Sequence, residues 1–280
     1  MHIESLLSAR LFLSPQLADD RLYFVSNLSG RLSLYAMDFG GSVPEPLLPP
    51  NIALQNPHLM DGYAFYVFPK LKKILVMLDH DGDENYQPLV IPITGGYPAP
   101  AFGDAFANCR VHCAHVDGLV YFNAESRTEQ KVVAWQADLA TGKLVKLGES
   151  KWGCEVAGVS ADHTKVILTD NYTSGDTVLY LWEKGKGERK LLFGTPLESR
   201  KGQPATLPAI GQCHFTGRGL LFTTAIFEDS YGLAYMESGA PQPVKIAGIK
   251  HKGAGELVGC RHLVPPGDHK SADDCYVRAR

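Results

Sequence analysis

Leu22-Tyr23-Phe24-Val25 is the first of five short apolar runs that return along the chain at a nearly regular spacing. The runs start 52, 45, 47 and 54 residues apart, which is the period of repeated four-stranded sheets. They are rich in β-branched and aromatic side chains and are bounded by turn-forming residues, which predicts buried strands rather than helices. The other four runs are Ile74-Leu75-Val76-Met77-Leu78, Leu119-Val120-Tyr121-Phe122, Val166-Ile167-Leu168 and Leu220-Leu221-Phe222.

A second set of positions repeats with the same period. If each run is the second strand of a sheet, a hairpin leads to a third strand with an aromatic or aliphatic residue, and these residues lie 55, 45, 45 and 54 apart. They are Tyr35, Val90, Trp135, Tyr180 and Ala234. Gly40-Gly41 and Gly95-Gly96 supply the turns after the first two third strands. We predict an all-β fold, a β-propeller of four-stranded antiparallel blades with about five complete blades and part of a sixth.

The repeats divide the chain into an N-terminal lead segment, residues 1–12, and a propeller array, residues 13–280, that is incomplete at its C-terminal end. Arg200-Lys201-Gly202-Gln203-Pro204 is expected to form an exposed connection between the fourth and fifth repeats. Cys275-Tyr276-Val277 resembles the opening of another second strand. A sheet left with an unpaired edge is an aggregation hazard, so we expect a longer protein or a partner that completes the array.

Composition excludes several classes of function. The chain has 280 residues, 45% of them hydrophobic, and a formal charge of −3 from 27 basic and 30 acidic residues. Such a balance gives no basic field for nucleic acid or anionic membranes, so neither is expected as a partner. The N-terminus lacks a basic and then apolar leader, and no segment reaches the roughly 18 apolar residues of a membrane span. A cytoplasmic location is therefore expected.

Six cysteines without a C-x-x-C pair favour free, buried thiols over a disulfide framework. The segment from Cys109 to His115 offers two cysteines and two histidines in seven residues. On a strand rising about 3.3 Å per residue, Cys109 and Cys113 lie roughly 13 Å apart, too far to share a zinc ion. We therefore predict no zinc site there.

Three stretches of the repeats carry a family resemblance. They are Leu13-Ser14-Pro15 before Arg21-Leu22-Tyr23-Phe24-Val25-Ser26, Leu34-Tyr35-Ala36-Met37-Asp38 running into Gly40-Gly41, and Asp79-His80-Asp81-Gly82-Asp83-Glu84-Asn85-Tyr86-Gln87 followed by Gly95-Gly96. In these stretches the sequence resembles the N-terminal propeller of the prolyl-oligopeptidase family of serine peptidases, in its dipeptidyl-peptidase and acylaminoacyl-peptidase branches, and more distantly TolB-like propellers. The resemblance covers the first 100 residues well and the rest by period.

The resemblance implies a propeller that caps an α/β-hydrolase domain and screens peptide substrates by size. The catalytic serine, aspartate and histidine of the family lie in that other domain, on and around a G-x-S-x-G nucleophile elbow. This chain has no such motif, because Gly40-Gly41-Ser42-Val43-Pro44 and Gly158-Val159-Ser160-Ala161-Asp162 each lack the second glycine. We therefore assign no catalytic residue and no cofactor, and do not expect the chain alone to be an enzyme.

The segment Asp79-His80-Asp81-Gly82-Asp83-Glu84-Asn85 has three aspartates at alternate positions, like the first half of a calcium loop. An EF-hand loop needs its glycine sixth and a glutamate twelfth, whereas here Gly82 is fourth and Val90 is twelfth. As a hairpin between strands, Asp-Gly supplies a positive φ and the carboxylates stay solvated. We predict a structural turn, with Asp79, Asp81 and Asp83 as a weak cation candidate and a contact with a neighbouring domain as a further alternative.

Other polar and aromatic residues are interpreted mainly as structural. Carboxylates in the hairpins between second and third strands would make one rim acidic: Glu125, Glu129, Asp170, Asp176, Glu228 and Asp229. A pair of them would support a glycosidase only at the right separation, which the sequence does not give. Histidines are expected in first strands or turns, and tryptophans in blade packing with a binding role as the alternative. These residues are His112, His115, His163, His214, Trp135, Trp152 and Trp182.

Three functions remain open at this point. The first is a noncatalytic propeller that gates and frames substrate for a prolyl-oligopeptidase-like serine peptidase, with its α/β-hydrolase domain in cis or supplied separately, and with peptides as possible ligands. The second is a stand-alone TolB-like or WD-like propeller that acts as a protein-binding scaffold. The third is a glycosidase-type propeller hydrolase.

Overall fold

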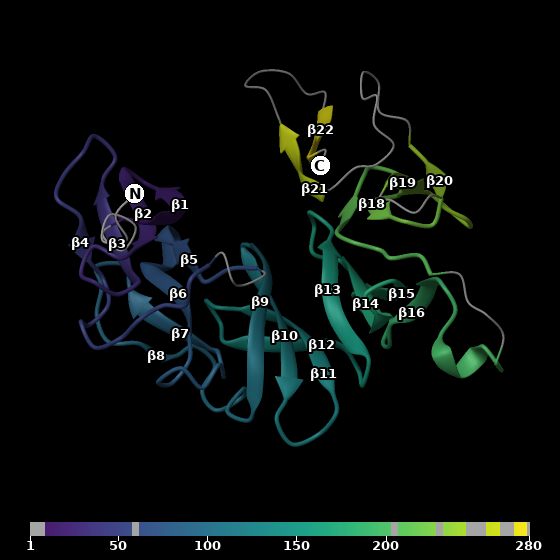
Figure 1. The fold of residues 1–280 in the computed structure, drawn as a ribbon, viewed down its shortest axis with the longest axis horizontal. Coiled ribbons are helices and arrows are strands. Elements are labelled where there is room, and N and C mark those ends of the chain that lie inside the picture. The colour runs from purple at the N-terminus through teal and green to yellow at the C-terminus, as the bar shows by residue number, and fades with distance from the viewer. Residues whose placement is uncertain are drawn as a thin grey trace, which may run out of the picture. The chain divides into compact units, whose positions relative to one another are not determined.

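The computed structural model describes residues 9–57, 62–202, 207–227 and 232–244, and the backbone of residues 256–263 and 272–278. In this part of the chain the structure is almost all β, with five four-stranded antiparallel sheets and two short 3₁₀ helices (Figure 1). In each sheet the four strands follow one another in chain order and pair with their sequence neighbours. The sequence prediction of repeated four-stranded antiparallel sheets is therefore confirmed.

We number the sheets 1 to 5 in chain order. Sheet 1 contains β1 (Phe12–Ala18), β2 (Arg21–Ser26), β3 (Ser33–Asp38) and β4 (Glu45–Pro46). Sheet 2 contains β5 (Phe65–Phe68), β6 (Lys73–Leu78), β7 (Gln87–Pro92) and β8 (Ala99–Pro100), with the helix η1 (Pro69–Leu71) between β5 and β6. Sheet 3 contains β9 (Cys109–Asp117), β10 (Leu119–Ser126), β11 (Val132–Asp138) and β12 (Lys143–Ser150).

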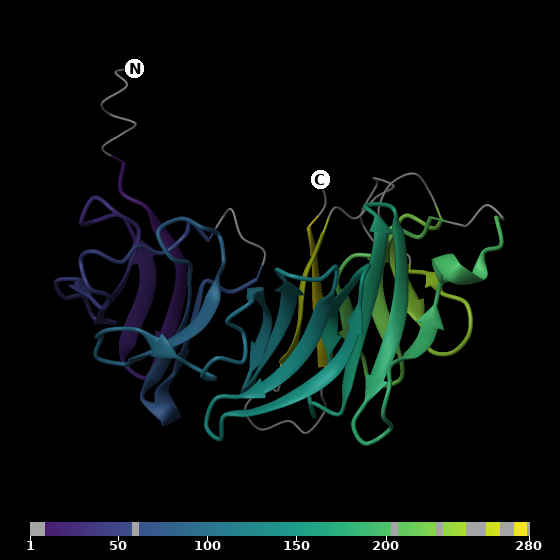
Figure 2. The same cartoon turned by 90° about the horizontal axis from the view of Figure 1, so that it is seen from below.

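Sheet 4 contains β13 (Gly153–Val159), β14 (Lys165–Thr173), β15 (Asp176–Glu183) and β16 (Lys190–Phe193), followed by the helix η2 (Leu197–Ser199). Sheet 5 contains β17 (Cys213–Phe215), β18 (Leu220–Thr224), β19 (Gly232–Met236) and β20 (Gln242–Pro243). Figure 2 shows the long strands of sheets 3 and 4 lying antiparallel within each sheet.

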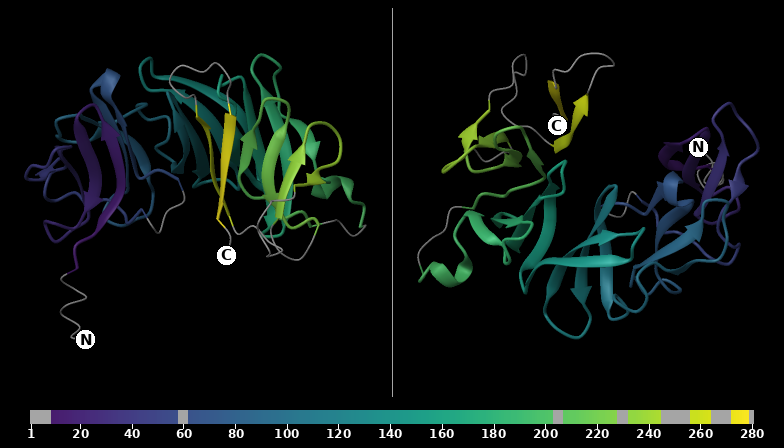
Figure 3. Two further views of the ribbon diagram at one scale, coloured as in Figure 1. Left: turned by 90° about the horizontal axis from the view of Figure 1, so that it is seen from above. Right: turned by 180° about the vertical axis from the view of Figure 1, so that it is seen from behind.

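A two-stranded sheet follows these five sheets. β21 (Glu256–Leu263) and β22 (Ala272–Arg278) run antiparallel and are drawn in yellow in Figure 3. β22 contains the predicted strand Cys275-Tyr276-Val277. Most of the predicted N-terminal lead segment, residues 1–12, lies outside the described residues, which begin at position 9.

All five apolar runs lie in the second strands, as the sequence predicted. β2, β6, β10, β14 and β18 are the second members of their sheets, and nearly every residue of the runs is buried. The five third-strand positions also lie in third strands, in β3, β7, β11, β15 and β19. Side chains on both faces of a second strand are buried, so these strands need apolar neighbours on each side.

Three apolar clusters cover these faces. One joins sheets 1 and 2, another joins sheets 2 and 3, and the last joins sheets 4 and 5. Each contains a phenylalanine with less than 2% of its surface exposed, namely Phe65, Phe122 and Phe222. Burying one such side chain stabilises the fold by about 1.5–3 kcal/mol.

The chain divides into two compact units. The first comprises residues 1–130 and 135–145, and the second comprises residues 131–134 and 146–280. The first two apolar clusters belong to the first unit and the third belongs to the second unit. No helix in the described residues is both long and apolar enough to cross a membrane.

First strands hold three buried, free thiols. Cys113 lies in β9, Cys154 in β13 and Cys213 in β17, and none is more than 3% exposed. Burial raises the pKa of Cys113 and Cys213 far above the usual thiol value, and raises that of Cys154 to about 11. β9 holds the whole segment from Cys109 to His115, so that segment is a strand, as predicted.

β13 and β17 approach closely at Gly158. A Cβ atom built on Gly158 would lie only 2.3 Å from the carbonyl oxygen of Cys213, which is a backbone atom. Gly158 does not have a left-handed φ, so its backbone conformation would tolerate a side chain. It is the contact between sheets 4 and 5 that requires glycine at this position. This contact sets the spacing of the two first strands.

We expect Gly158→Ala to lower the free energy of unfolding by about 1–3 kcal/mol, because the added methyl group must push the two strands apart. Urea titration followed by tryptophan fluorescence measures the change. Gly175→Ala is the matched control, since nothing lies within 4 Å of its Cβ position and its φ is not left-handed. Equal unfolding midpoints for the two variants would show that the contact does not constrain the strands.

Candidate interaction site

The acidic segment from Asp79 to Asn85 forms the hairpin between β6 and β7, as predicted. Asp81 and Gly82 adopt positive φ values of 53° and 82°. The Asp83 carboxylate accepts hydrogen bonds from the backbone N–H groups of Asn85 and His80, at 2.9 and 3.2 Å, and from the Asn85 amide at 2.9 Å. The bonds from Asn85 are the main cause of a lowered pKa at Asp83. These contacts stabilise the turn itself.

Asp79 accepts a separate hydrogen bond from the backbone N–H of Glu84 at 3.1 Å, while Asp81 is 93% exposed at its side chain. Within the residues that the structure describes, no group of three or more His, Cys, Asp or Glu side chains has the arrangement of a metal site. The cation site at Asp79, Asp81 and Asp83 stays a prediction.

The prediction of an acidic rim is wrong for two of its carboxylates. Asp170 and Asp176 are only 3% and 6% exposed, and each is paired with an arginine. Glu125 and Glu129 are exposed as expected, and Glu228 and Asp229 lie outside the described residues. The physical reason for Asp170 is that it continues the stretch of β14, residues 166–170, that is buried on both faces of the sheet.

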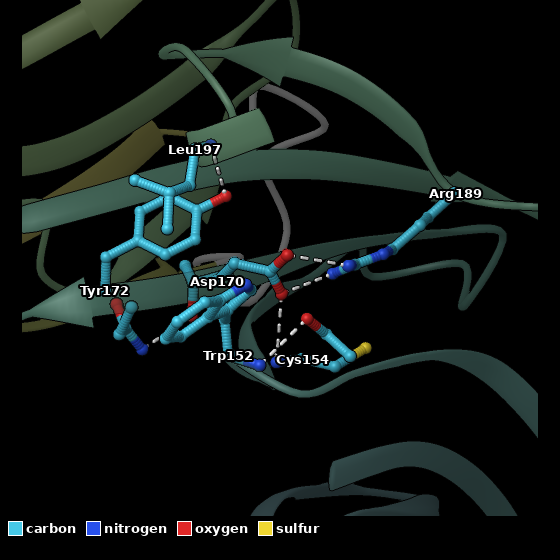
Figure 4. A network of polar contacts seen from close by, with 9 residues as sticks. Trp152, Cys154, Asp170, Tyr172, Arg189 and Leu197 are labelled. Carbon is cyan, nitrogen blue, oxygen red and sulfur yellow. Dashed lines mark hydrogen bonds and ion pairs between the residues drawn. The ribbon is translucent and has the colours of Figure 1, made fainter. Parts of the chain in front are cut away.

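Asp170 forms a two-pronged ion pair with Arg189. Both guanidinium nitrogens donate to the two carboxylate oxygens at 2.8 Å, and the backbone N–H of Cys154 donates to Oδ1 at 3.2 Å (Figure 4). The guanidinium also lies 4.0 Å from the centre of the Tyr180 ring. Gly148 leaves room for this arginine, since a Cβ atom there would lie 3.1 Å from Arg189 Cδ. The buried carboxylate is therefore fully matched by donors.

Two ionisable groups have raised pKa values here, Arg189 of the pair and Tyr180 beside it. Desolvation lowers the pKa of Arg189, but hydrogen bonding to Asp170 and nearby negative charge outweigh it and raise the pKa overall. Burial, reinforced by the Asp170 charge, raises the pKa of Tyr180 to about 12. Both groups therefore keep their protons throughout the physiological range.

Asp176 forms a second pair of the same kind with Arg200. The distances from the guanidinium nitrogens to the carboxylate oxygens are 2.6 and 2.8 Å, and the guanidinium also donates to the carbonyl oxygen of Thr195. The Arg200 side chain is only 11% exposed, so the prediction of an exposed connection is wrong at this residue. The hydrogen bond to Asp176 holds its side chain back against the β14–β15 hairpin and raises its pKa.

Two aromatic rings lie next to the second pair. Arg200 lies 4.9 Å from the centre of the Tyr172 ring, and Trp152 packs edge-on against the same ring with 5.3 Å between centroids. Lys151 lies 5.1 Å from the Trp152 ring. The Tyr172 hydroxyl accepts a hydrogen bond from the backbone N–H of Leu197 at 3.1 Å (Figure 4). We call Lys151, Trp152, Tyr172, Leu197 and Arg200 the aromatic platform.

The platform has the composition of a protein-binding surface. Trp, Tyr and Arg are the residues most enriched at energetic hot spots of interfaces, and Leu197 adds a large apolar side chain that is 41% exposed. Its side chains are held by the contacts above, so little conformational entropy would be lost on binding. Because Arg200 is paired with the Asp176 carboxylate, the cluster suits contact with another molecule better than acid–base chemistry.

The remaining predicted residues lie where expected. His112 and His115 are in β9, His214 is in β17, and His163 is in the turn before β14 with a φ of 56°. Trp135 and Trp182 are packing residues: Trp135 meets Phe106 edge-on at 6.3 Å, and Trp182 is 4% exposed. Trp152 also packs within the blade, edge-on against Tyr172, and belongs to the aromatic platform.

Comparison with solved structures identifies the architecture. The chain is similar to a prolyl endopeptidase, with a TM-score of 0.62, 10% identity, and coverage of 92% of this chain and 39% of the other. It is also similar to a puromycin-hydrolyzing peptidase from Mycobacterium tuberculosis, with a TM-score of 0.59, 12% identity, and coverage of 85% and 38%.

The matched part of both peptidases is their N-terminal propeller. The chain has a β-propeller fold. Sheets 1 to 5 are thus blades 1 to 5, and the aromatic platform belongs to blade 4. A further match is TolB from Acinetobacter baumannii, with a TM-score of 0.43, 16% identity, and coverage of 83% and 56%.

The chain spans about two-fifths of the length of the peptidases it matches. No family model and no curated protein sequence matches it.

The sequence analysis did not predict that Asp170 and Asp176 are paired with arginines, although the sequence contains an indication of such a pair at Asp170. Asp170 lies two residues after the apolar run Val166-Ile167-Leu168, and a buried carboxylate requires a nearby cation. That reasoning predicts a buried ion pair but not which arginine supplies it. Arg189 is 19 residues away and Arg200 is 24 residues from Asp176.

We expect Asp170→Asn to lower the free energy of unfolding by about 3 kcal/mol or more, because it leaves the Arg189 guanidinium buried without its counter-charge. Chemical denaturation monitored by circular dichroism measures the loss. Asp81→Asn, at an exposed position, is the control and should change stability by less than about 0.5 kcal/mol. The double variant Asp170→Leu with Arg189→Met should recover much of the loss, and failure to recover would argue against charge burial as the cause.

Proposed function

We propose that this chain is the noncatalytic propeller of a prolyl-oligopeptidase-like serine peptidase, and that it gates access of peptides to an α/β-hydrolase domain. The observation that carries the proposal is the match over 92% of this chain to only 39% of a prolyl endopeptidase. A chain that matches the propeller and lacks a G-x-S-x-G motif would supply substrate screening and leave the chemistry to the other domain. Under this proposal it works in the cytoplasm.

The paired carboxylates support a structural rather than a catalytic role for blade 4. Asp170 and Asp176 are buried and bound to arginines, which removes two of the six carboxylates considered for glycoside hydrolysis. A hydrolytic pair must reach both substrate and water, and a carboxylate held by a guanidinium is a weak base. The described structure thus offers little support for the glycosidase alternative.

A binding scaffold is the second candidate, and the aromatic platform favours it. A preformed cluster of Trp152, Tyr172 and Arg200 at the end of blade 4 could hold a protein partner without any hydrolase domain. The two candidates differ in what accompanies the propeller in the cell. The intact mass of the native polypeptide in its source, together with the reading frame after the codon for Arg280, distinguishes them.

Under the peptidase proposal, the frame continues into a domain with a G-x-S-x-G motif, or a separate hydrolase chain co-purifies with this one. A native polypeptide of 30.6 kDa that purifies without a hydrolase would overturn the peptidase proposal and favour the scaffold.

We expect the purified chain to show no turnover of peptidyl-prolyl or acyl-peptide substrates and no labelling by a fluorophosphonate, because no serine is activated in a nucleophile elbow. Fluorogenic release and in-gel fluorescence measure the two properties. An intact prolyl endopeptidase assayed alongside is the positive control. Labelling of a serine in this chain with stoichiometry near one would contradict the assignment.

A further inference from the structure

A pocket lies between blades 4 and 5, at the end of β14 opposite the aromatic platform. Its volume is 220 Å³, and it is lined by the start of β14, the turn between β17 and β18 and the turn after β19. Both blades belong to the second compact unit. Drug-sized sites are typically 300–1,000 Å³, so this pocket suits a smaller group, such as one amino-acid residue.

The floor of the pocket is apolar. Leu181, Leu192 and Phe215 line it, are half-buried, and pack on the apolar cluster shared by the two blades. Beneath them Leu220 and Met236 are almost fully buried. An apolar side chain placed on this floor would displace water from surfaces that are already partly desolvated.

The mouth of the pocket carries an excess of positive charge. Lys165 and Arg218 line it and are exposed, against one carboxylate, that of Glu237. Glu183, which lies opposite Lys165 across the β14–β15 pair, has its carboxylate bound by Lys186 at 3.1 and 3.0 Å. Long basic side chains at the edge of an apolar floor are complementary to a carboxylate attached to an apolar group.

Glycines keep the mouth open. Gly217 and Gly239 line the pocket, and nothing lies within 4 Å of the Cβ position of either residue. Gly217 does not have a left-handed φ, so a larger residue would be tolerated by the backbone there. An open, uncrowded mouth lets a chain leave the pocket after one residue has entered.

We propose that this pocket binds the C-terminal residue of a peptide that ends in a leucine or another large apolar side chain. The side chain rests on Leu181, Leu192 and Phe215, and the terminal carboxylate is held by Lys165 and Arg218. The inference rests on this pocket alone and does not depend on the proposed function.

Titration of the full chain with a hexapeptide ending in leucine, followed by two-dimensional NMR, tests the proposal. The free acid should bind at least about tenfold more tightly than its C-terminal amide, since a charge-assisted hydrogen bond is worth about 1.5–3 kcal/mol. The same peptide ending in glycine should also bind more weakly. N-acetyl-leucine tests whether a small free acid suffices. Three results would each overturn the proposal. They are equal binding of acid and amide, binding of N-acetyl-leucine but not of the peptide, and no binding of the peptide at concentrations up to about 10 mM.

Two test variants, each with a matched control, show whether the peptide binds in this pocket or elsewhere on the surface. Gly217→Phe should abolish binding by filling the mouth, while Gly175→Phe, at the other end of blade 4 and equally open, should not. The double variant Lys165→Gln with Arg218→Gln should remove the preference for acid over amide, whereas Lys143→Gln with Arg127→Gln should keep it. Unchanged thermal unfolding of all variants shows that they are folded, and unchanged peptide binding by Gly217→Phe would place the peptide elsewhere and overturn the proposal.

Discussion

Burial of the second strand on both faces is the constraint on which the rest of this structure depends. A four-stranded sheet whose middle is apolar on both sides cannot be stable alone, so each sheet must be covered by others. Val25, Val76 and Phe122 meet this requirement inside clusters that join consecutive sheets. The turns, the short outer strands and the exposed hairpins tolerate wide variation in sequence because they do not provide that cover.

Blade 4 departs from apolar burial at two aspartates, which lie near the same end of the blade. Asp170 and Asp176 replace apolar burial with ion pairs whose desolvation offsets much of their attraction. Well-packed apolar residues of similar volume often stabilise a fold at least as well as such pairs do. Arg189 lies against Tyr180, and Arg200 lies against Tyr172. At this end of blade 4 the aromatic rings are therefore packed against paired arginines.

Periodicity was sufficient to predict the strands, because alternation and spacing are properties of short windows. It was sufficient for the hairpin at Asp81 and Gly82 as well, since a positive φ demands those residue types. It was not sufficient for the partners of Asp170 and Asp176, because Arg189 lies in the β15–β16 turn and Arg200 in the connection between β16 and β17, and the paths of both depend on tertiary packing. The pocket between blades 4 and 5 was out of reach for the same reason, because six strands, β14 to β19, and two turns build it.

Alkylation of the buried thiols can report local opening of this fold. Cys113, Cys154 and Cys213 lie one to a blade in blades 3, 4 and 5, and only the thiolate of each reacts with alkylating reagents. Since burial opposes ionisation at all three, modification of any one records an opening of its own blade. Mass spectrometry of partly alkylated protein would therefore rank the blades by how often each one opens.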